Sequence, residues 1–120
     1  MATPSAPGIG PGSSDAAQRM VAAGSGYETV AASQTAQVLG AAGAVGDTID
    51  GLLVIPETTS PGQVLLLDGA TSITLFVGGA SSVSNLIPFP IPLGMRSVNG
   101  PWKVTTGADV SVIGIGNFTS

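Results

Sequence analysis

The residues whose types could do chemistry are four acids that stand beside glycine or proline: Asp47, Asp50, Glu57 and Asp68. Asp47 and Asp50 could offer two oxygen ligands to Ca²⁺, but a calcium loop supplies more ligands at closer spacing. A pair of the acids could hydrolyse a glycosidic bond in an aromatic cleft, yet the chain holds one Trp and one Tyr. Aspartates beside glycines are commonly turn residues, and the spacing favours this interpretation.

Other catalytic schemes lack a residue type that they need. The chain has no His and no Cys, which removes the commonest general base, the usual zinc ligands and every disulfide. Its serines therefore have no ordinary triad, and a Ser–Lys pair would need Lys103, which is expected to face solvent. The sequence predicts no catalytic, cofactor-binding or metal site. We therefore expect a protein that is not an enzyme, with a carbohydrate-active enzyme as the less favoured alternative.

The charge content separates this chain from ordinary soluble domains. Charged residues make up 8% of it, against roughly 25% in typical domains. Three Lys and Arg residues are too few to neutralise a phosphate backbone, so no nucleic-acid partner is expected. No apolar run approaches the ~18 residues that span a bilayer, so no membrane partner is expected. We expect assembly with other subunits to cover the surface; the alternative is a neutral Gly, Ser and Thr surface that tolerates exposure.

Residues 1–35 differ from the rest of the chain. They are rich in Ala, Gly, Ser and Pro and carry few large apolar side chains, so they cannot bury enough area to offset their ordering entropy. We expect an extended N-terminal arm that orders only against a partner, with one short helix possible at residues 14–23. The GxxGxxG run of Gly40, Gly43 and Gly46 is interpreted as a hinge between this arm and the following domain.

The sequence pattern of residues 36–120 predicts one β domain. Turn signals recur along it at short intervals, and the runs between them are rich in Val, Ile, Leu and Thr, which is typical of a sandwich or barrel. Asp68-Gly69 is the clearest hairpin signal. A small domain without disulfides commonly gains stability by oligomerisation. The predicted class is all-β, a jelly-roll-like sandwich or small barrel of about seven strands, near residues 36–39, 51–56, 63–67, 72–77, 86–93, 102–106 and 109–118.

Two of these expected strands carry unusual patterns. In residues 86–93 the apolar side chains alternate with Pro88, Pro90 and Pro92. The missing N–H donors then lie along one edge, which predicts an edge strand that cannot be extended on that side. The alternative is a polyproline-like loop over the surface. Residues 109–118 are apolar on both faces, which suggests a bulge near 112–113 and a second subunit on one side.

The candidate contact residues come from these patterns and from residue type. Arg96 and Trp102 stand out because Arg and Trp are enriched at the centres of interfaces. The alternative for Trp102 is the domain core, and the alternative for Arg96 is a bond within the chain. The remaining candidates lie on the arm and on the two unusual strands: Arg19, Tyr27, Phe89, Ile113 and Ile115.

Five segments together resemble a known class of protein; in order they are Val64–Gly69, Ser72–Gly79, Pro88–Gly94, Gly100–Gly107 and Val110–Gly114. Over about residues 46–120 the chain resembles the small β-sandwich decoration, or cement, proteins of tailed bacteriophage heads. The resemblance lies in the style and order of the segments. It implies a jelly-roll-like module, often trimeric, on the outside of an icosahedral shell, whose arm reaches across neighbouring capsid subunits. It implies no catalytic residues.

The function expected from this resemblance is that of a virion structural protein. It would bind the outer capsid surface and stabilise the shell by bridging major capsid subunits, with the major capsid protein and further copies of itself, as a homotrimer, as partners. The main alternative is a phage fibre-tip or receptor-binding module, which would need an exposed aromatic or acidic pocket. A non-viral assembly protein also fits the composition.

Overall fold

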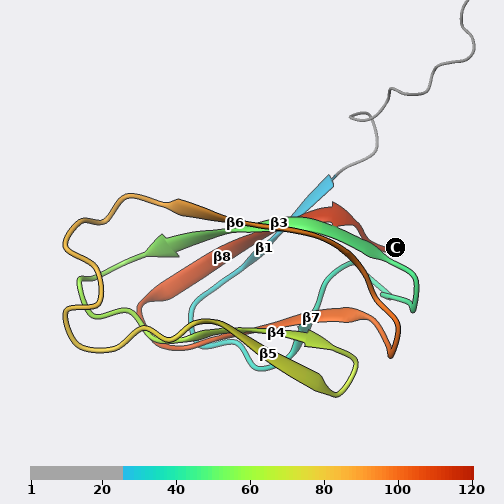
Figure 1. The fold of residues 1–120 in the computed structure, drawn as a ribbon, viewed down its shortest axis with the longest axis horizontal. Coiled ribbons are helices and arrows are strands. Elements are labelled where there is room, and N and C mark those ends of the chain that lie inside the picture. Colours follow the sequence, from blue (N-terminus) through green and yellow to red (C-terminus); the bar gives the residue numbers. More distant parts are fainter. Residues whose placement is uncertain (1–25) are drawn as a thin grey trace, which may run out of the picture.

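The computed structural model describes residues 26–120. These residues form two antiparallel four-stranded sheets that lie as two layers (Figure 1). Sheet A has the order β1-β8-β3-β6 and sheet B the order β2-β7-β4-β5. The strands are β1 Gly26–Val30, β2 Gln37–Val38, β3 Thr48–Pro56, β4 Val64–Asp68, β5 Thr71–Phe76, β6 Phe89–Arg96, β7 Trp102–Thr106 and β8 Val110–Asn117.

The topology is that of a jelly roll. Strands β4 and β5 form a hairpin, β3 pairs with β6, β2 with β7, and β1 with β8, all antiparallel. The chain is therefore one long hairpin rolled up so that successive pairs alternate between the two sheets, as in eight-stranded jelly rolls. This confirms the expected all-β, jelly-roll-like sandwich. Each of the seven expected strands overlaps an observed one.

The eighth strand, β1, corrects the expected domain boundary. Gly26–Val30 pairs with β8 along its whole length, so these residues belong to the sandwich, which includes residues from Gly26 onward rather than from residue 36. These residues were expected in the arm because residues 1–35 carry few large apolar side chains, and the inward position at the centre of the strand is occupied by Glu28 rather than by an apolar residue. Its carboxylate accepts hydrogen bonds from the Gly40 N–H (2.7 Å) and the Gln37 amide (3.0 Å). The possible helix at residues 14–23 lies outside the described residues.

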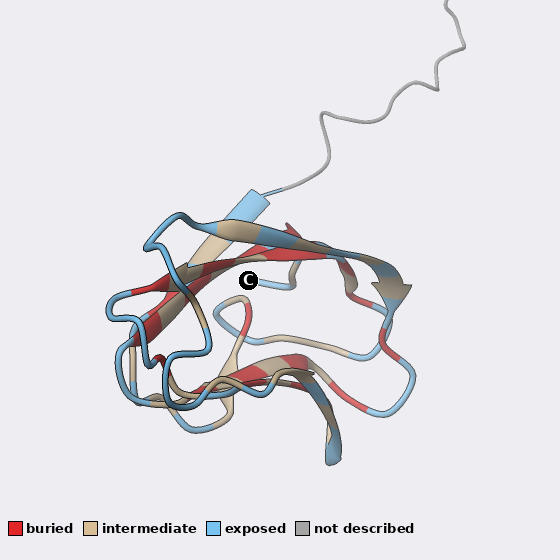
Figure 2. Cartoon of the chain, turned by 60° about the vertical axis from the view of Figure 1, so that its left-hand side comes forward, coloured by how far each residue is buried: buried red, intermediate tan, exposed pale blue. Residues whose placement is uncertain are grey.

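The core lies between the sheets, where the buried residues of both layers meet (Figure 2). Trp102 is its largest fully buried side chain, 2% exposed, and its indole N–H donates to the Asp47 carbonyl at 2.9 Å. Burying this ring with its one polar atom satisfied is the arrangement that an interior tryptophan requires. The other buried apolar residues are Val30, Leu39, Ile49, Leu52, Val54, Val64, Leu66, Val104, Val110 and Val112.

The hairpin at Asp68-Gly69 is confirmed. Asp68 pairs with Thr71, which leaves Gly69 and Ala70 as a two-residue loop, and Gly69 has a φ of 60°. The Asp68 carboxylate is buried and accepts from three successive backbone N–H groups, those of Val98, Asn99 and Gly100. This acid is therefore a turn former that also holds the loop between β6 and β7.

Strand β8 is apolar on both faces, as expected, but it carries no bulge. Its residues alternate without interruption, with Ile113 and Ile115 facing outward and Gly114 and Gly116 facing inward. A Cβ on Gly114 would lie 3.1 Å from the Leu39 side chain, and one on Gly116 would lie 2.8 Å from the Ile49 Cα. The inward positions are glycines because neighbouring elements already occupy the space.

The register shift lies instead in the neighbouring strand β3, between Ile49 and Gly51. Asp50 is the extra residue of this bulge. After Ile49, the next inward-facing side chain of β3 is therefore that of Leu52. Leu53 therefore faces outward, although strict alternation from Ile49 would place it in the core.

The edge strand predicted at residues 86–93 is β6, an edge strand of sheet A, but it begins at Phe89, so Pro88 lies in the loop before it. It pairs with β3 on one side. Pro90 and Pro92 on it are exposed, while Phe89 and Ile91, which alternate with them, are half-buried. Prolines offer no N–H to an incoming strand, so this edge of the sheet is closed to further pairing.

The glycine run does not form a hinge between arm and domain. Gly40, Gly43 and Gly46 lie in the loop from β2 to β3, and each has a positive φ. The loop is held to the C-terminal segment, since the Gly43 N–H donates to the Thr119 carbonyl at 2.9 Å. A Cβ on Gly43 would lie 2.6 Å from Pro101. Gly43 therefore lies in a closely packed turn of this loop, whereas Gly46 is exposed and an added Cβ there would meet no atom within 4 Å.

Candidate protein-binding face

The outward surface of sheet A carries apolar side chains on all four strands, with the polar Thr29 opposite Ile113 and Ser111 opposite Ile55. Leu53 stands at its centre, directly opposite Ile113 on β8 and Pro90 on β6. Tyr27 on β1 stands opposite Ile115 on β8. We call this surface the sheet A face and define it by the outward side chains of Tyr27, Leu53, Pro90, Pro92, Ile113 and Ile115. A solvated sheet surface normally carries polar side chains, so an apolar one indicates a contact surface.

The sheet A face contains two shallow hollows. One, of about 330 Å³, lies between β3 and β6 and is lined by Leu53, Pro90, Pro92 and Ile115 among others. The other, of about 500 Å³, is lined by Gly26, Tyr27, Leu53, Ile113 and Ile115. Leu53 and Ile115 line both hollows. The face therefore offers two adjoining apolar hollows to the side chains of a partner.

The outward surface of sheet B has a different character. Leu65 and Leu67 face outward on its strand β4, but polar residues flank each of them. Leu65 lies between Thr74 and Thr105 in the neighbouring strands, and Leu67 lies between Ser72 and Lys103. Sheet B thus has the mixed polar and apolar pattern of a solvent-exposed sheet, and the outward surface of sheet A is the more apolar of the two.

The candidate contact residues separate in the structure. Ile113, Ile115 and Tyr27, the last 73% exposed, lie together on the sheet A face. Arg96 is exposed at the end of β6. Arg19 lies outside the described residues.

Two candidates face the interior instead. The structure gives Trp102 the alternative role, because its ring is enclosed between the sheets. Phe89 is half-buried and packs against the core, with its ring in a T-shaped contact with Phe76 at a centroid distance of 5.4 Å. Neither ring is placed to be a main anchor for a partner.

The sequence did not single out Leu53. It lies in an apolar run, residues 52–55, in which every position could be core, and the bulge beside Asp50 decides its face. Pro90 and Pro92 were noted for the donors that they lack rather than for the apolar surface that they add. The register of β3 against β6 is what brings these prolines beside Leu53.

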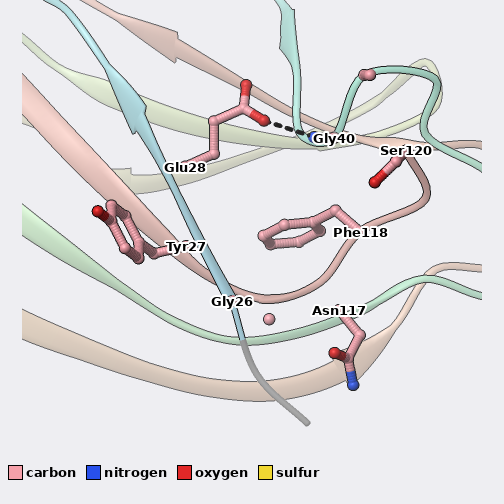
Figure 3. A pocket seen from close by; sticks show the side chains of 9 residues that line it. Gly26, Tyr27, Glu28, Gly40, Asn117, Phe118 and Ser120 are labelled. Carbon is pink, nitrogen blue, oxygen red and sulfur yellow. Dashed lines mark hydrogen bonds between the residues drawn. The ribbon is translucent and has the colours of Figure 1, made fainter.

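A third hollow, of about 340 Å³, lies at the free edge of β1 (Figure 3). Glu28 reaches across it to the Gly40 N–H, and the ring of Phe118 lies beside it. Asn117 and Tyr27 also line it. This hollow is more polar than the two on the sheet A face, so an acidic group and an apolar surface adjoin each other at β1.

The acids at Asp47, Asp50, Glu57 and Asp68 do not gather into one site. No group of three or more acids that could hold a metal ion occurs among residues 26–120. Asp50 is exposed near the start of β3, and Glu57 is exposed just after its end. Asp47 and Asp68 are buried, and both hold backbone N–H groups.

Asp47 fastens the C-terminal segment to the sandwich. Its carboxylate accepts from the Ala44 N–H (3.0 Å), the Thr119 N–H (2.9 Å) and the Thr119 hydroxyl (2.6 Å). Burial raises the pKa of Asp47, but the hydrogen bonds from Thr119 and Ala44 lower it by more and hold the pKa below its ordinary value of 3.8. The ionised carboxylate is therefore the form that the fold stabilises.

Replacing Asp47 by asparagine is expected to lower the free energy of unfolding by about 1–3 kcal/mol near neutral pH, because an amide cannot accept all three bonds. Since the folded pKa lies below 3.8, the wild-type advantage is present above that value and is lost as the pH falls through the folded pKa. Urea unfolding of both proteins at about pH 6.5 and about pH 2.5 measures this. An equal difference at the two pH values would contradict the assignment.

Comparison with known protein families, curated proteins and solved structures found no match. Within the part of the chain that the structure describes, no helix has the length and apolarity to cross a membrane. The features that bear on function are the two unequal faces of the sandwich and the composition of the chain.

Proposed function

We propose that this chain is a virion structural protein that binds the outer surface of a tailed-phage capsid and bridges major capsid subunits, acting as a homotrimer. The observation that carries the proposal is the sheet A face, an apolar surface centred on Leu53 that residues 26–120 leave uncovered. Two further features support it. The chain has 8% charged residues, and five of its segments resemble capsid decoration proteins.

The mechanism follows from apolar burial. Fully burying a Leu, Ile or similar side chain contributes about 1.5–3 kcal/mol, and the side chains of the sheet A face are partly buried already. Each copy therefore gains a few kcal/mol, from which the cost of association must be subtracted. Attachment as a trimer raises the overall affinity, since the second and third copies bind at high effective concentration once the first is bound.

The experiment is attachment to heads that lack decoration protein. Purified protein incubated with such heads is expected to sediment with them, to saturate at a fixed number of copies per head, and to raise the temperature at which the heads disrupt. Protein that stays in the supernatant at every concentration would contradict the proposal.

A receptor-binding module is the second candidate, and one observation favours it. The hollow of Figure 3 combines the acidic Glu28 with the aromatic Phe118. However, the Glu28 carboxylate already accepts two hydrogen bonds within the chain, so it has less capacity to accept hydrogen bonds from a glycan. Binding of the purified protein to a glycan array, together with no attachment to heads, would favour this candidate over decoration.

A further inference from the structure

The four edge strands of the two sheets differ in how they are closed to further pairing. Strand β6 is closed by Pro90 and Pro92, β2 is only two residues long, and β1 carries Glu28 at its centre. Prolines, charged side chains and short length are devices that keep an edge strand from pairing with another chain. Strand β5, at the edge of sheet B (Figure 1), contains no proline and no charged residue. Among residues 26–120 it is therefore the edge that is least protected against an added strand.

The regular part of β5 is its first four residues, 71–74. The strand pairs with β4 on one side only, and a register shift at Leu75 interrupts that ladder. Ser72 and Thr74 face outward and are exposed, whereas Ile73 faces inward. The unpaired side of an edge strand presents backbone N–H and C=O groups that another strand can bind.

Ile73 is an apolar side chain that the sandwich covers only in part. Its cross-strand neighbour Leu66 on β4 is fully buried, but Ile73 is half-buried because β5 is the last strand of the sheet. A strand added beside β5 would cover it. Since side chains directly opposite each other in a sheet are in contact, the added strand needs an apolar residue at that position.

A second copy of β5 meets this requirement. Residues directly opposite each other in an antiparallel pair point to the same face of the sheet, so two copies can be set with Ile73 opposite Ile73. That register also sets Ser72 of each copy opposite Thr74 of the other, which pairs small hydroxyl side chains, and no charges meet. The same pairing at β1 would bring two Glu28 carboxylates together, which is destabilising. Strand β5 is thus an edge strand that complements itself.

A second copy is also favoured over the chain segment that precedes Gly26. Phe76 of β5 contacts Phe89 of β6, and β6 is the edge of sheet A furthest from β1. Gly26, the first residue of β1, therefore lies on the opposite side of the sandwich from β5. A second copy presents its β5 already folded as a strand, so the pairing orders little additional chain.

We propose that two copies of this chain pair antiparallel through β5, about a two-fold axis at Ile73, so that their B sheets become one continuous sheet. Such an axis runs perpendicular to the sheet, which makes the contact isologous and turns both sheet A faces to the same side. Paired copies can therefore lie side by side on one capsid surface; this consequence rests on the proposed function, whereas the pairing itself does not. The two-fold contact is separate from the three-fold contact of the proposed homotrimer.

A single introduced cysteine tests the register on the full-length protein. The chain has no Cys, so any disulfide formed by one introduced cysteine joins two chains. Ile73→Cys places two cysteines directly opposite each other, whereas Ser72→Cys places them diagonally, about 7–8 Å apart and beyond the usual reach of a disulfide. Under mild oxidation, Ile73→Cys is expected to form covalent dimers at least about tenfold faster than Ser72→Cys. Chance collisions would favour the opposite order, because Ser72 is the more exposed residue.

A charge comparison tests the pairing through the two outward positions. Added to Ile73→Cys, the substitutions Ser72→Lys and Thr74→Lys set two lysines opposite each other at both positions. Ser72→Asp with Thr74→Lys, the matched control, sets unlike charges opposite each other instead. Because like charges directly opposite each other are destabilising and unlike charges are stabilising, the two-lysine protein is expected to crosslink at least about fivefold more slowly than the control. Thermal unfolding of both proteins checks that they are equally folded.

Three results would overturn the proposal: no crosslinked dimer from Ile73→Cys, faster crosslinking of Ser72→Cys, or equal rates for the two charge variants. Each concerns contact between copies in the absence of a capsid, so attachment to heads is decided separately by the experiment on undecorated heads.

Discussion

Replacing Trp102 by alanine is expected to lower the free energy of unfolding by about 3–5 kcal/mol, the usual cost of deleting a buried tryptophan side chain. The ring fills the space between the sheets and is 2% exposed. Domains of this size are stable by about 5–15 kcal/mol, so much of that margin would be lost. The Asp47 carbonyl, which accepts from the indole, also accepts from the Ser97 N–H at 2.9 Å. The loss is therefore mainly one of packing.

Urea unfolding of wild type, Trp102→Ala and Trp102→Phe separates the contributions. The phenylalanine variant keeps most of the ring volume and loses the N–H bond, so it is expected to lose clearly less stability than the alanine variant. A loss below about 1 kcal/mol for Trp102→Ala, a typical value for an average site, would mean that the ring is not a core residue and would return it to the interface candidates.

Replacing Leu53 by aspartate is expected to reduce attachment to heads by at least about tenfold, equivalent to about 1.4 kcal/mol of binding free energy. Leu53 lies at the centre of the sheet A face and lines both of its hollows. A charge there would have to be desolvated at the middle of the contact, where truncations commonly cost most.

The matched control for this variant is Leu65→Asp. Leu65 is likewise a half-buried, outward leucine on an inner strand, but it belongs to sheet B and lies between Thr74 and Thr105. Both substitutions are expected to reduce stability by a similar amount, within the usual 0.5–3 kcal/mol, as thermal unfolding would measure. Only Leu53→Asp is expected to weaken attachment. Equal losses of attachment would show that binding follows stability and not the sheet A face.

The strand content was predictable because the local signals agree with the fold. Alternating apolar residues, the Asp68-Gly69 hairpin and the prolines of residues 86–93 each indicate a feature that the structure contains. These signals depend on neighbours in the chain. The all-β sandwich therefore follows from the sequence, while the pairing of β1 with β8 depends on residues far apart in it.

The face of β3 was not predictable in the same way. One extra residue at the bulge between Ile49 and Gly51 exchanges the inward and outward positions that follow it. A run such as residues 52–55, apolar at every position, gives no local sign of that exchange. The central residue of the proposed contact, Leu53, is therefore visible only once the register against Ile113 and Pro90 is known.

The strand β1 was hidden for a related reason. An inward glutamate argues against a buried strand when the sequence is read alone. In the folded chain the Gly40 N–H and the Gln37 amide satisfy Glu28. Both partners come from β2 and its following loop, so the compensation is a product of the topology rather than of the local sequence.

Sedimentation velocity of the full-length protein, alone and after mixing with undecorated heads, decides whether the chain works through the sheet A face. A protein that works through the sheet A face is expected to sediment as more than one chain when alone and to move into the head fraction when mixed. A stable monomer that remains unbound beside the heads would contradict the account.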